Sequence, residues 1–393
     1  MDRRLLALDV ENFRSLRDVS LPLRPLNVLV GPNGAGKTNV LEVFRFLSDV
    51  IRADLEPALA WRGGFDGVVF RGGVTPPESI GIKLTATWTA HSTIKAPDKY
   101  VLRIERGGVA RRERFEFTRA GGRGRRIEVR HTKVTIADTG GGQVEERTVG
   151  LHRLSSGLST LPRLSDEEGG PEVAVLAGGF ASCRVFDVDV ATVRRPARIV
   201  GGTQELLEHD AANLAAFLLN MRGRHETAWN ELVDDAAQVL PQLRDIDFEF
   251  PSGAAREAIV VLNERGLRRP TQLADASYGT IRLLGLLAML YDPNPPALTC
   301  VEEIDHGLHP QALELLVHRL REASARTQFL IATHSPAMAD RLKPEELVIC
   351  ERHDDGSSVI PAISTEKMRE IVRESEDTPL GELWFSGALG GDL

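Results

Sequence analysis

Residues 26–38 read LNVLVGPNGAGKT and combine an apolar run, a glycine-rich turn and a Lys-Thr pair. The apolar run predicts a buried strand, and Lys37 is predicted to begin a helix. Together they form the G-x-x-x-x-G-K-[ST] pattern of a phosphate-binding loop, in the strand–loop–helix context that such a loop requires. Glycines let the backbone turn tightly enough for several N–H groups to point at one phosphate. The stretch therefore predicts a site for a nucleoside triphosphate.

Within this loop, Lys37 is predicted to reach the β- and γ-phosphates, while the Thr38 hydroxyl would ligate Mg²⁺. The N-terminus of the following helix adds the positive end of its dipole. The predicted nucleotide-binding residues of the loop are Asn33, Gly34, Ala35, Gly36, Lys37, Thr38 and Asn39.

The composition is that of an ordinary globular protein. The chain has 393 residues, of which 42% are hydrophobic and 26% charged, and this length predicts two or three compact units. A net charge of −8 argues against a protein that is basic throughout but allows a local basic face. The three cysteines lack metal-ligand spacing, and no apolar run is long enough to span a bilayer. We therefore expect a cytoplasmic protein with no membrane partner.

Hydrophobic periodicity predicts the order of the structural elements. The predicted strands are 5–12, 26–30, a meander from 80 to about 138, then 247–250, 258–262, 297–301, 329–332 and 347–350. The predicted helices are 39–51, a helical region at 203–240, then 281–290 and 310–324. The predicted connections are 61–73, 140–142 and 155–172.

Three further motifs follow in the last third of the chain. The first is SYGTIR, from Ser277, which opens a predicted helix. A serine cap with Gly279 beside it would make an anion site, although an ordinary capped helix has the same pattern. The second is LTCVEE, a predicted buried strand that ends in two carboxylates. Glu302 would face Mg²⁺, and Glu303 would orient or deprotonate the attacking water.

The third motif is the predicted strand that ends in Thr333 and His334, 31 residues after Glu303. A strand of this kind delivers its last side chains to the carboxyl edge of an open α/β sheet, where ligands collect. We expect the His334 imidazole to contact the γ-phosphate.

The order of these motifs is typical of the ATPase heads of ABC and SMC proteins. The chain resembles the coil-less RecF-like and OLD-like bacterial AAA/ABC ATPases. The stretches that carry the resemblance are NFRSL from Asn12, GPNGAGKTN from Gly31, SYGTIR from Ser277, Glu302-Glu303 with GLHP from Gly307, THSP from Thr333 and LGELW from Leu380. The resemblance implies an α/β fold, a P-loop NTPase of the ABC/SMC-head type with an antiparallel β lobe and an inserted helical lobe.

The resemblance also implies a division of the chain into four segments. Residues 1–65 would form the first part of the ATPase head, 66–150 an antiparallel β-rich lobe, 151–255 a helical lobe, and 256–393 the second part of the head. The chain departs from the family pattern at two positions. Tyr278 stands where the signature usually has a small or acidic residue, which puts contacts across a dimer in doubt, and Ile304 stands where proline is usual.

Heads of this family enclose two ATP molecules, with Mg²⁺, between two protomers, so the resemblance implies an ATPase that forms a homodimer on ATP binding. Ser277 and Gly279 would then complete the site of the partner. Arg14 would lie near the nucleotide, where a fixed cation favours phosphoryl transfer. The implied catalytic residues are Glu303, His334 and Lys37.

Residues 103–133 carry the clearest charge anomaly, with eleven Lys or Arg and four Glu, a net charge of +7. Such a cluster is a candidate contact for the phosphate backbone of duplex DNA. The alternative is a solvated hairpin whose arginines pair with acids elsewhere, and both interpretations stay open from the sequence. The predicted DNA contacts are Arg111, Arg112, Arg119, Arg123, Arg125 and Arg126.

Two biological roles fit these features. One is a DNA-responsive ATPase of genome maintenance, repair or anti-phage defence. The other is a regulatory ATPase that controls a separately encoded nuclease or toxin. Because no acidic nuclease domain or zinc pattern follows the ATPase motifs, we expect any nuclease activity to come from such a partner.

The substitution Glu303→Gln tests the predicted general base, because it keeps the size of the side chain and removes its basicity. We expect the variant to retain ATP binding and to lose about 10²-fold or more in turnover, the scale typical of a general base. Binding of a fluorescent ATP analogue and steady-state phosphate release measure the two quantities. Hydrolysis near the wild-type rate would show that Glu303 is not the base.

Overall fold

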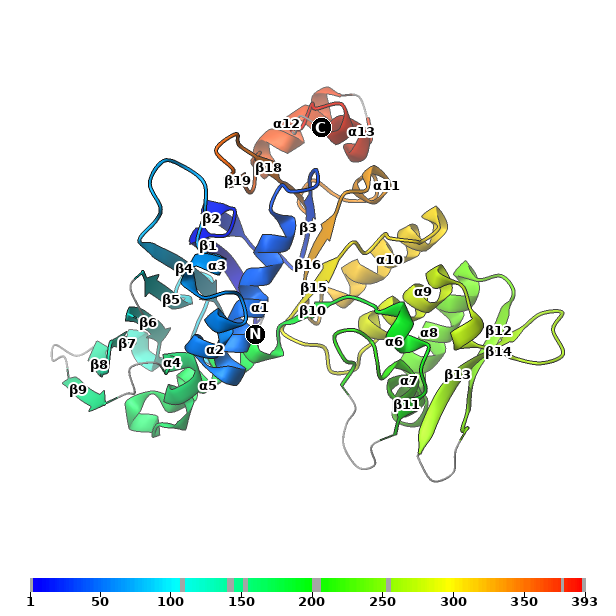
Figure 1. Ribbon diagram of the computed structural model, residues 1–393, viewed down its shortest axis with the longest axis horizontal. Helices are drawn as coiled ribbons and strands as arrows, with labels where there is room; N and C mark the ends of the chain where they lie inside the picture. Colours follow the sequence, from blue (N-terminus) through cyan, green and yellow to red (C-terminus); the bar gives the residue numbers. More distant parts are fainter. Residues whose placement is uncertain are drawn as a thin grey trace.

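The structure is a computed structural model that describes residues 3–106, 110–139, 145–150, 155–199, 206–251, 256–375 and 378–390. The predicted connection at 140–142 lies outside these residues. A parallel sheet occupies the centre, with an antiparallel β lobe on one side and a helical lobe on the other (Figure 1).

The central sheet has five parallel strands in the order β10-β15-β16-β3-β17. Their bounds are β10 Arg184–Phe186, β15 Leu298–Glu302, β16 Gln328–Thr333, β3 Leu26–Val30 and β17 Leu347–Ile349. Every residue of β3 and β16 is buried, as expected of strands covered on both faces. Val28 and Val30 face the core of the helical lobe, whereas Leu29 faces the core of the antiparallel lobe.

The antiparallel lobe is an eight-stranded sheet in the order β2-β1-β4-β5-β6-β7-β8-β9. Its strands are β1 Leu5–Phe13, β2 Leu16–Pro22, β4 Ser79–Ala86, β5 Asp98–Glu105, β6 Ala110–Thr118, β7 Gly124–Arg130, β8 Lys133–Thr139 and β9 Glu145–Gly150. Its apolar face packs in the same core as α1, Lys37–Ala53. Since β1 and β2 share this sheet with β4 to β9, strands from residues 1–65 and from 66–150 form one layer. The four-segment division stays a prediction.

Among the elements of this lobe that were not predicted are one strand and one helix. Strand β2 escaped notice because Arg17 and Asp18 interrupt its alternation, although Leu16, Val19 and Leu21 are buried. The other element is helix α5, Gly170–Ser182, whose two consecutive glycines resemble a turn. A Cβ atom at Gly179 would lie 2.6 Å from the Trp88 ring, so this glycine permits close packing instead.

Short helices lie in and beside the predicted connections. They are α2 Leu55–Ala60, α3 Phe65–Val68, α4 Gly157–Thr160, η2 Leu161–Arg163 and η3 Asp166–Glu168. The sequence prediction of plain loops at 61–73 and 155–172 is therefore wrong in part. Asp54 caps α2 and also accepts a hydrogen bond from the Ser156 N–H at 2.5 Å, which ties the two stretches together.

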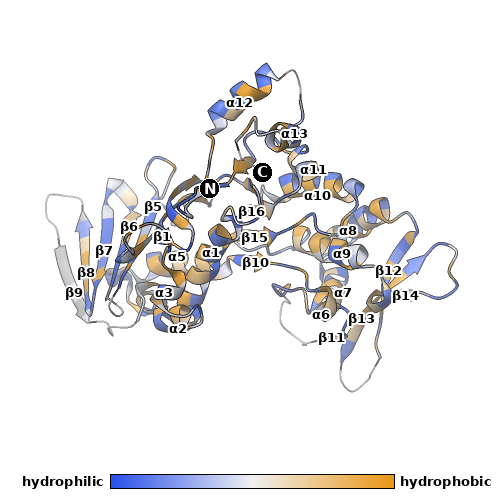
Figure 2. Cartoon of the chain, turned by 45° about the horizontal axis from the view of Figure 1, so that its top comes forward, coloured by the Kyte–Doolittle hydropathy of each residue, from blue (hydrophilic) through white to orange (hydrophobic). Residues whose placement is uncertain are grey.

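The helical lobe combines helices with a small antiparallel sheet. Its elements are α6 Val190–Val193, β11 Ala197–Arg198, α7 Leu214–Arg224, α8 Glu226–Val239, β12 Leu243–Glu249, β13 Glu257–Glu264, β14 Thr271–Gln272, η4 Leu273–Asp275 and α9 Tyr278–Leu290. Helix α9 is largely hydrophobic along its length (Figure 2), and every residue from Ile281 to Leu290 is buried. It lies between the rest of this lobe and the central sheet and is the structural link between them.

The remaining elements follow the central strands. They are α10 Pro310–Ala323, α11 Pro336–Ala339, β18 Glu351–Arg352, β19 Ser358–Val359, α12 Thr365–Glu374 and α13 Leu380–Phe385. The β18–β19 hairpin returns to the N-terminal part of the chain, where the Ser358 N–H donates to the Ser15 carbonyl oxygen at 2.8 Å. Among the described residues, no helix has both the length and the apolarity of a membrane-spanning segment.

Candidate nucleotide-binding site

The carboxyl ends of β3, β15 and β16 meet at one edge of the central sheet, because Ala332 pairs with Glu302 on one side and Thr333 pairs with Val30 on the other. A pocket of about 240 Å³ opens there. It is lined by Asn33, Gly34, Gly36, Lys37, Thr38, Asn39, Glu302, Glu303, Ala332, Thr333, His334 and Arg352. Nine of these residues were predicted to bind nucleotide, metal or the attacking water, so three separate motifs form a single site.

The phosphate-binding loop has the backbone geometry that its glycines predict. Gly34 and Gly36 have φ angles of 83° and 102°, in the left-handed region that disfavours other residues. A Cβ atom at Gly36 would lie 2.1 Å from the Ser358 hydroxyl oxygen, so the hairpin packs directly on the loop. Helix α1 begins at Lys37, which places its free N–H groups at the pocket. Ala35, between these two glycines, is buried and does not line the pocket.

The Lys37 ammonium group is held by the loop itself. Its Nζ donates hydrogen bonds to the carbonyl oxygens of Gly31, at 2.6 Å, and Pro32, at 2.9 Å. Burial lowers the pKa of Lys37, and the nearby Glu303 carboxylate acts in the opposite direction. A phosphate in the pocket would compete for the ammonium group with the two carbonyl oxygens.

Thr38 and Glu302 provide adjacent oxygen atoms. The Thr38 hydroxyl donates to a Glu302 carboxylate oxygen at 3.3 Å. Burial raises the pKa of Glu302, although the Arg45 guanidinium and the Thr38 hydroxyl act in the opposite direction. One hydroxyl and one carboxylate fit Mg²⁺, which usually takes one or two protein oxygens and completes its shell with phosphates and water. Among the described residues, no cluster of three or more His, Cys, Asp or Glu side chains could hold a metal by itself.

Glu303 follows β15 in an unusual backbone conformation, with a φ angle of 45°. Its N–H donates to the Ala332 carbonyl oxygen at 2.8 Å, and the turn that it starts carries Asp305 and His306. The His306 Nδ1 atom lies 3.2 Å from a Glu303 carboxylate oxygen, and the carboxylate is about half exposed. Such a group can meet a water molecule at the pocket, as a general base must. His334 is exposed and lines the same pocket.

Besides Ala35, three predicted nucleotide-contacting residues do not line this pocket. Ser277 caps α9, its hydroxyl oxygen accepting from the Thr280 N–H at 3.1 Å. Gly279 lies beside the Gly307 carbonyl oxygen, and Tyr278 between them is 42% exposed. Arg14 lines a neighbouring pocket of about 470 Å³ and lies 3.7 Å from the Glu42 carboxylate. One protomer therefore does not bring the signature to its own nucleotide pocket.

Sequence reasoning missed Arg352, which borders both the phosphate pocket and the pocket beside Arg14. Its guanidinium donates to the Gly34 carbonyl oxygen at 3.1 Å. No local pattern marks this arginine, because the β18–β19 hairpin carries it back to the loop from more than 300 residues away. Asn39, which was predicted, donates to the Ser15 hydroxyl at 2.7 Å, and Ser15 contacts Ser358 at the same distance.

The structure contradicts two of the six predicted DNA contacts. The Arg111 side chain is fully buried against Glu113, and the Arg125 side chain is 2% exposed with hydrogen bonds to Asp138 at 2.6 and 2.8 Å. Neither guanidinium reaches the surface, so the prediction is wrong for these residues. The sequence alone could not predict this burial, because a shift of one residue along a strand exchanges its buried and exposed faces.

The other four predicted contacts remain at the surface. Arg123 is exposed, and the side chains of Arg112 and Arg126 are 58% and 47% exposed. Arg119 is less free, because it pairs with Glu172 at 3.1 Å. DNA binding by these four residues stays a prediction.

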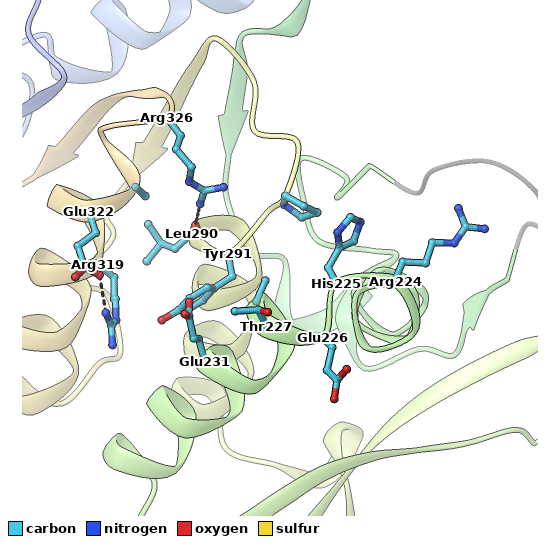
Figure 3. Close-up of a pocket in the computed structure, with 13 residues that line it drawn as sticks. Arg224, His225, Glu226, Thr227, Glu231, Leu290, Tyr291, Arg319, Glu322 and Arg326 are labelled. Atoms are coloured by element: carbon cyan, nitrogen blue, oxygen red, sulfur yellow. Dashed lines mark hydrogen bonds and ion pairs between the residues drawn. The ribbon is translucent and has the colours of Figure 1, made fainter.

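A second pocket, of about 580 Å³, lies in the helical lobe between the N-terminus of α8 and the C-terminal ends of α9 and α10 (Figure 3). Two of its lining residues bind the buried Asp235 carboxylate behind them: the Tyr291 hydroxyl donates to it at 2.6 Å, and Arg319 donates to it at 2.6 and 2.8 Å. These interactions pair the buried carboxylate fully and stabilise the packing of the helices. The pocket contains none of the phosphate-binding residues.

Comparison with known proteins agrees with this geometry. The chain matches, over residues 26–147 and 199–340, the family model described as "AAA domain, putative AbiEii toxin, Type IV TA system". The chain belongs to this family. The family contains P-loop ATPases, and the predicted relationship to SMC-, RecF- and OLD-like ATPases is confirmed.

Two curated relatives match over short stretches. One is the OLD nuclease of Thermus scotoductus, 50% identical over 52 residues, which cover 13% of this chain and 9% of that protein. The other is the DNA replication and repair protein RecF of Brucella abortus, 39% identical over 75 residues, which cover 16% and 20%. The match thus spans a fifth or less of the length of these relatives.

Solved structures match over nearly the whole chain. The Smc head bound to the C-terminal winged-helix domain of ScpA has a TM-score of 0.56 at 13% identity and covers 93% of this chain and 99% of that one. The Pyrococcus furiosus Smc head with an extended coiled coil has a TM-score of 0.53 at 12% identity, with coverage of 95% and 99%. The predicted fold class, a P-loop NTPase of the ABC/SMC-head type, is therefore confirmed.

Proposed function

We propose that this chain binds ATP with Mg²⁺ and hydrolyses it to ADP and phosphate. The observation that supports this most strongly is the convergence of the loop after β3, the carboxylates after β15 and the histidine after β16 on one pocket. Lys37 and the α1 N-terminus would bind the β- and γ-phosphates, and Thr38 and Glu302 would hold the metal. Glu303 would take the proton of the attacking water, and His334 would contact the γ-phosphate.

The outward-facing signature supports a homodimer as the active state. Ser277 and Gly279 begin a helix whose first N–H groups are not used in the nucleotide pocket of their own protomer. In a two-fold dimer these groups would approach the γ-phosphate held by the partner, so each site would be complete only across the interface. ATP binding would then favour the dimer, and hydrolysis would release it.

ATP turnover measured over a range of protein concentrations tests this proposal. If each site is completed by a second protomer, the rate per protomer should rise with concentration and reach a plateau, as expected for a bimolecular association. Addition of linear duplex DNA should increase the rate if DNA favours the dimer. No hydrolysis at any concentration, with or without DNA, would contradict the proposed activity.

One proposed role is a DNA-responsive ATPase in genome maintenance or anti-phage defence. It is supported by the outer face of the antiparallel sheet, where Arg103, Arg112, Arg130 and Lys133 occupy directly paired positions on β5 to β8. Like charges in opposite positions destabilise a sheet, so a row of four cations is costly without a bound anion. Nearby carboxylates offset only part of the repulsion between these cations, since Arg112 and Arg130 keep 58% and 63% of their side-chain surface exposed. A phosphate backbone has the charge to occupy this row.

A second role, control of a separately encoded toxin or nuclease, is supported by the family description, which names a toxin of a toxin–antitoxin system. A solved head of the same fold is bound to a domain of ScpA, which supports a protein partner for heads of this shape. In this case DNA would leave the turnover unchanged.

The double substitution Arg112→Glu with Lys133→Glu separates the two roles. It makes charges alternate along the row, so each new glutamate faces an arginine and the sheet should not lose stability. We expect duplex affinity to fall by about tenfold or more at low salt, and the salt dependence to weaken. The matched control is Arg268→Glu with Arg269→Glu, the same charge change at exposed positions of the helical lobe. Equal DNA affinity in both double variants would exclude the row as a DNA contact.

A further inference from the structure

Helix α9 contacts the segment of the paired carboxylates along one of its faces. Gly279, Arg282 and Gly285 follow one another at intervals of three, so each is a neighbour of the next on the surface of the helix. A Cβ atom at Gly279 would lie 2.6 Å from the Gly307 carbonyl oxygen, and one at Gly285 would lie 2.8 Å from the Val188 side chain. The helix therefore packs closely on its neighbours at Gly279 and at Gly285, and Arg282 lies between these two positions along the helix axis.

Arg282 is 3% exposed and reaches the backbone on either side of Glu303. Its Nη2 donates to the Glu303 carbonyl oxygen at 2.7 Å and to the Glu302 carbonyl oxygen at 3.2 Å. Its Nη1 donates to an Asp187 carboxylate oxygen at 3.0 Å. Asp187 follows β10, whose last residue, Phe186, pairs with Val301 of β15, so the carboxylate and the two carbonyl groups belong to adjacent strand ends. The guanidinium therefore joins α9 to two strands of the central sheet.

These two carbonyl groups determine how Glu303 is directed. They belong to the peptide planes before and after its Cα atom, which fix the direction of the Cα–Cβ bond. Glu303 has a φ angle of 45°, a conformation that is unfavourable for a residue with a side chain and needs support from its surroundings. The Ala332 carbonyl oxygen and the His306 N–H also hold its backbone, at 2.8 and 3.0 Å. Among the described side chains, Arg282 is the one that donates to both carbonyl oxygens.

We infer that Arg282 is a positioning residue for Glu303, held in place by Asp187. This inference rests on the proposed function, in which Glu303 is the general base. Arg282 lies one turn after Tyr278 in the signature, so a displacement of the start of α9 moves the guanidinium and, through it, the Glu303 backbone. Engagement of the signature with a second protomer is thereby linked to the base in the same protomer as that signature.

The substitution Arg282→Gln tests this role, with turnover and nucleotide affinity measured separately. We expect kcat to fall about 10- to 100-fold, because small misplacements of a catalytic group have effects of this size. The dissociation constant for a fluorescent ATP analogue with Mg²⁺ should stay within about threefold, since Arg282 does not line the pocket. Arg282→Lys, which retains a cationic donor group on a single nitrogen, should recover part of the rate.

A double-mutant cycle with Glu303→Gln distinguishes positioning from a general structural effect. If Arg282 acts through Glu303, adding Arg282→Gln to Glu303→Gln should leave the residual single-turnover rate unchanged within about twofold. Asp187→Ala serves as a second variant if Arg282→Gln does not fold, because the Asp187 side chain is 65% exposed. It should lower kcat about three- to tenfold with the same pattern in the cycle.

The matched control is Arg326→Gln. Arg326 donates to two backbone carbonyl oxygens at the other end of α9, those of Leu290 and Asp292, both at 3.0 Å. Figure 3 marks the bond to Leu290. The substitution removes hydrogen bonds of the same kind at the opposite end of α9 from Arg282, and should keep kcat within about twofold.

Two results would overturn the inference: a kcat of Arg282→Gln within about twofold of wild type, or an equal further loss when Glu303 is already glutamine. In both cases the wild-type chain still hydrolyses ATP, so the proposed function stands. A wild-type chain that neither binds nor hydrolyses ATP with Mg²⁺ would instead contradict the proposed function, and this inference with it.

Discussion

The parallel pairing of β16 with β15 on one side and β3 on the other is the constraint on which the site depends. The registers place Glu302, Thr333 and Val30 at neighbouring strand ends, so residues from three distant parts of the chain meet at one edge. Both faces of the sheet are covered, which keeps its strands apolar and fixes their order. The β18–β19 hairpin then packs on Gly36 and holds the phosphate-binding loop from outside.

The same sheet is connected to the signature through α9. This helix is buried over nearly its whole length, so its position is set by the core of the helical lobe. Its first turn nevertheless lines no part of the nucleotide pocket of its own protomer. A buried helix whose exposed start is proposed to bind the partner's phosphate is suited to report a contact made at that start to the sheet behind it.

The sequence was sufficient to predict which residues of contiguous motifs meet at one edge of the central sheet. The phosphate-binding loop, Glu302, Glu303 and His334 could be predicted because each follows an apolar strand, and the fold implied by their order is confirmed. Arg352 and the contact between Arg282 and Asp187 could not be predicted, since tertiary structure alone brings their partners together. The sequence also could not predict on which face of the sheet Arg111 and Arg125 lie. In strands with many charged residues the alternation fits either face, because a shift of one residue exchanges the two faces.

The central claim, that each nucleotide site is completed by the signature of a second protomer, is tested most directly by mixing two inactive variants. Lys37→Ala removes the phosphate-binding lysine, and Ser277→Glu places a negative charge at the signature. In an equimolar mixture, random pairing gives heterodimers with one intact composite site, so the turnover should recover to about a quarter of the wild-type value. A mixture no faster than the mean of the two separate variants would contradict the claim.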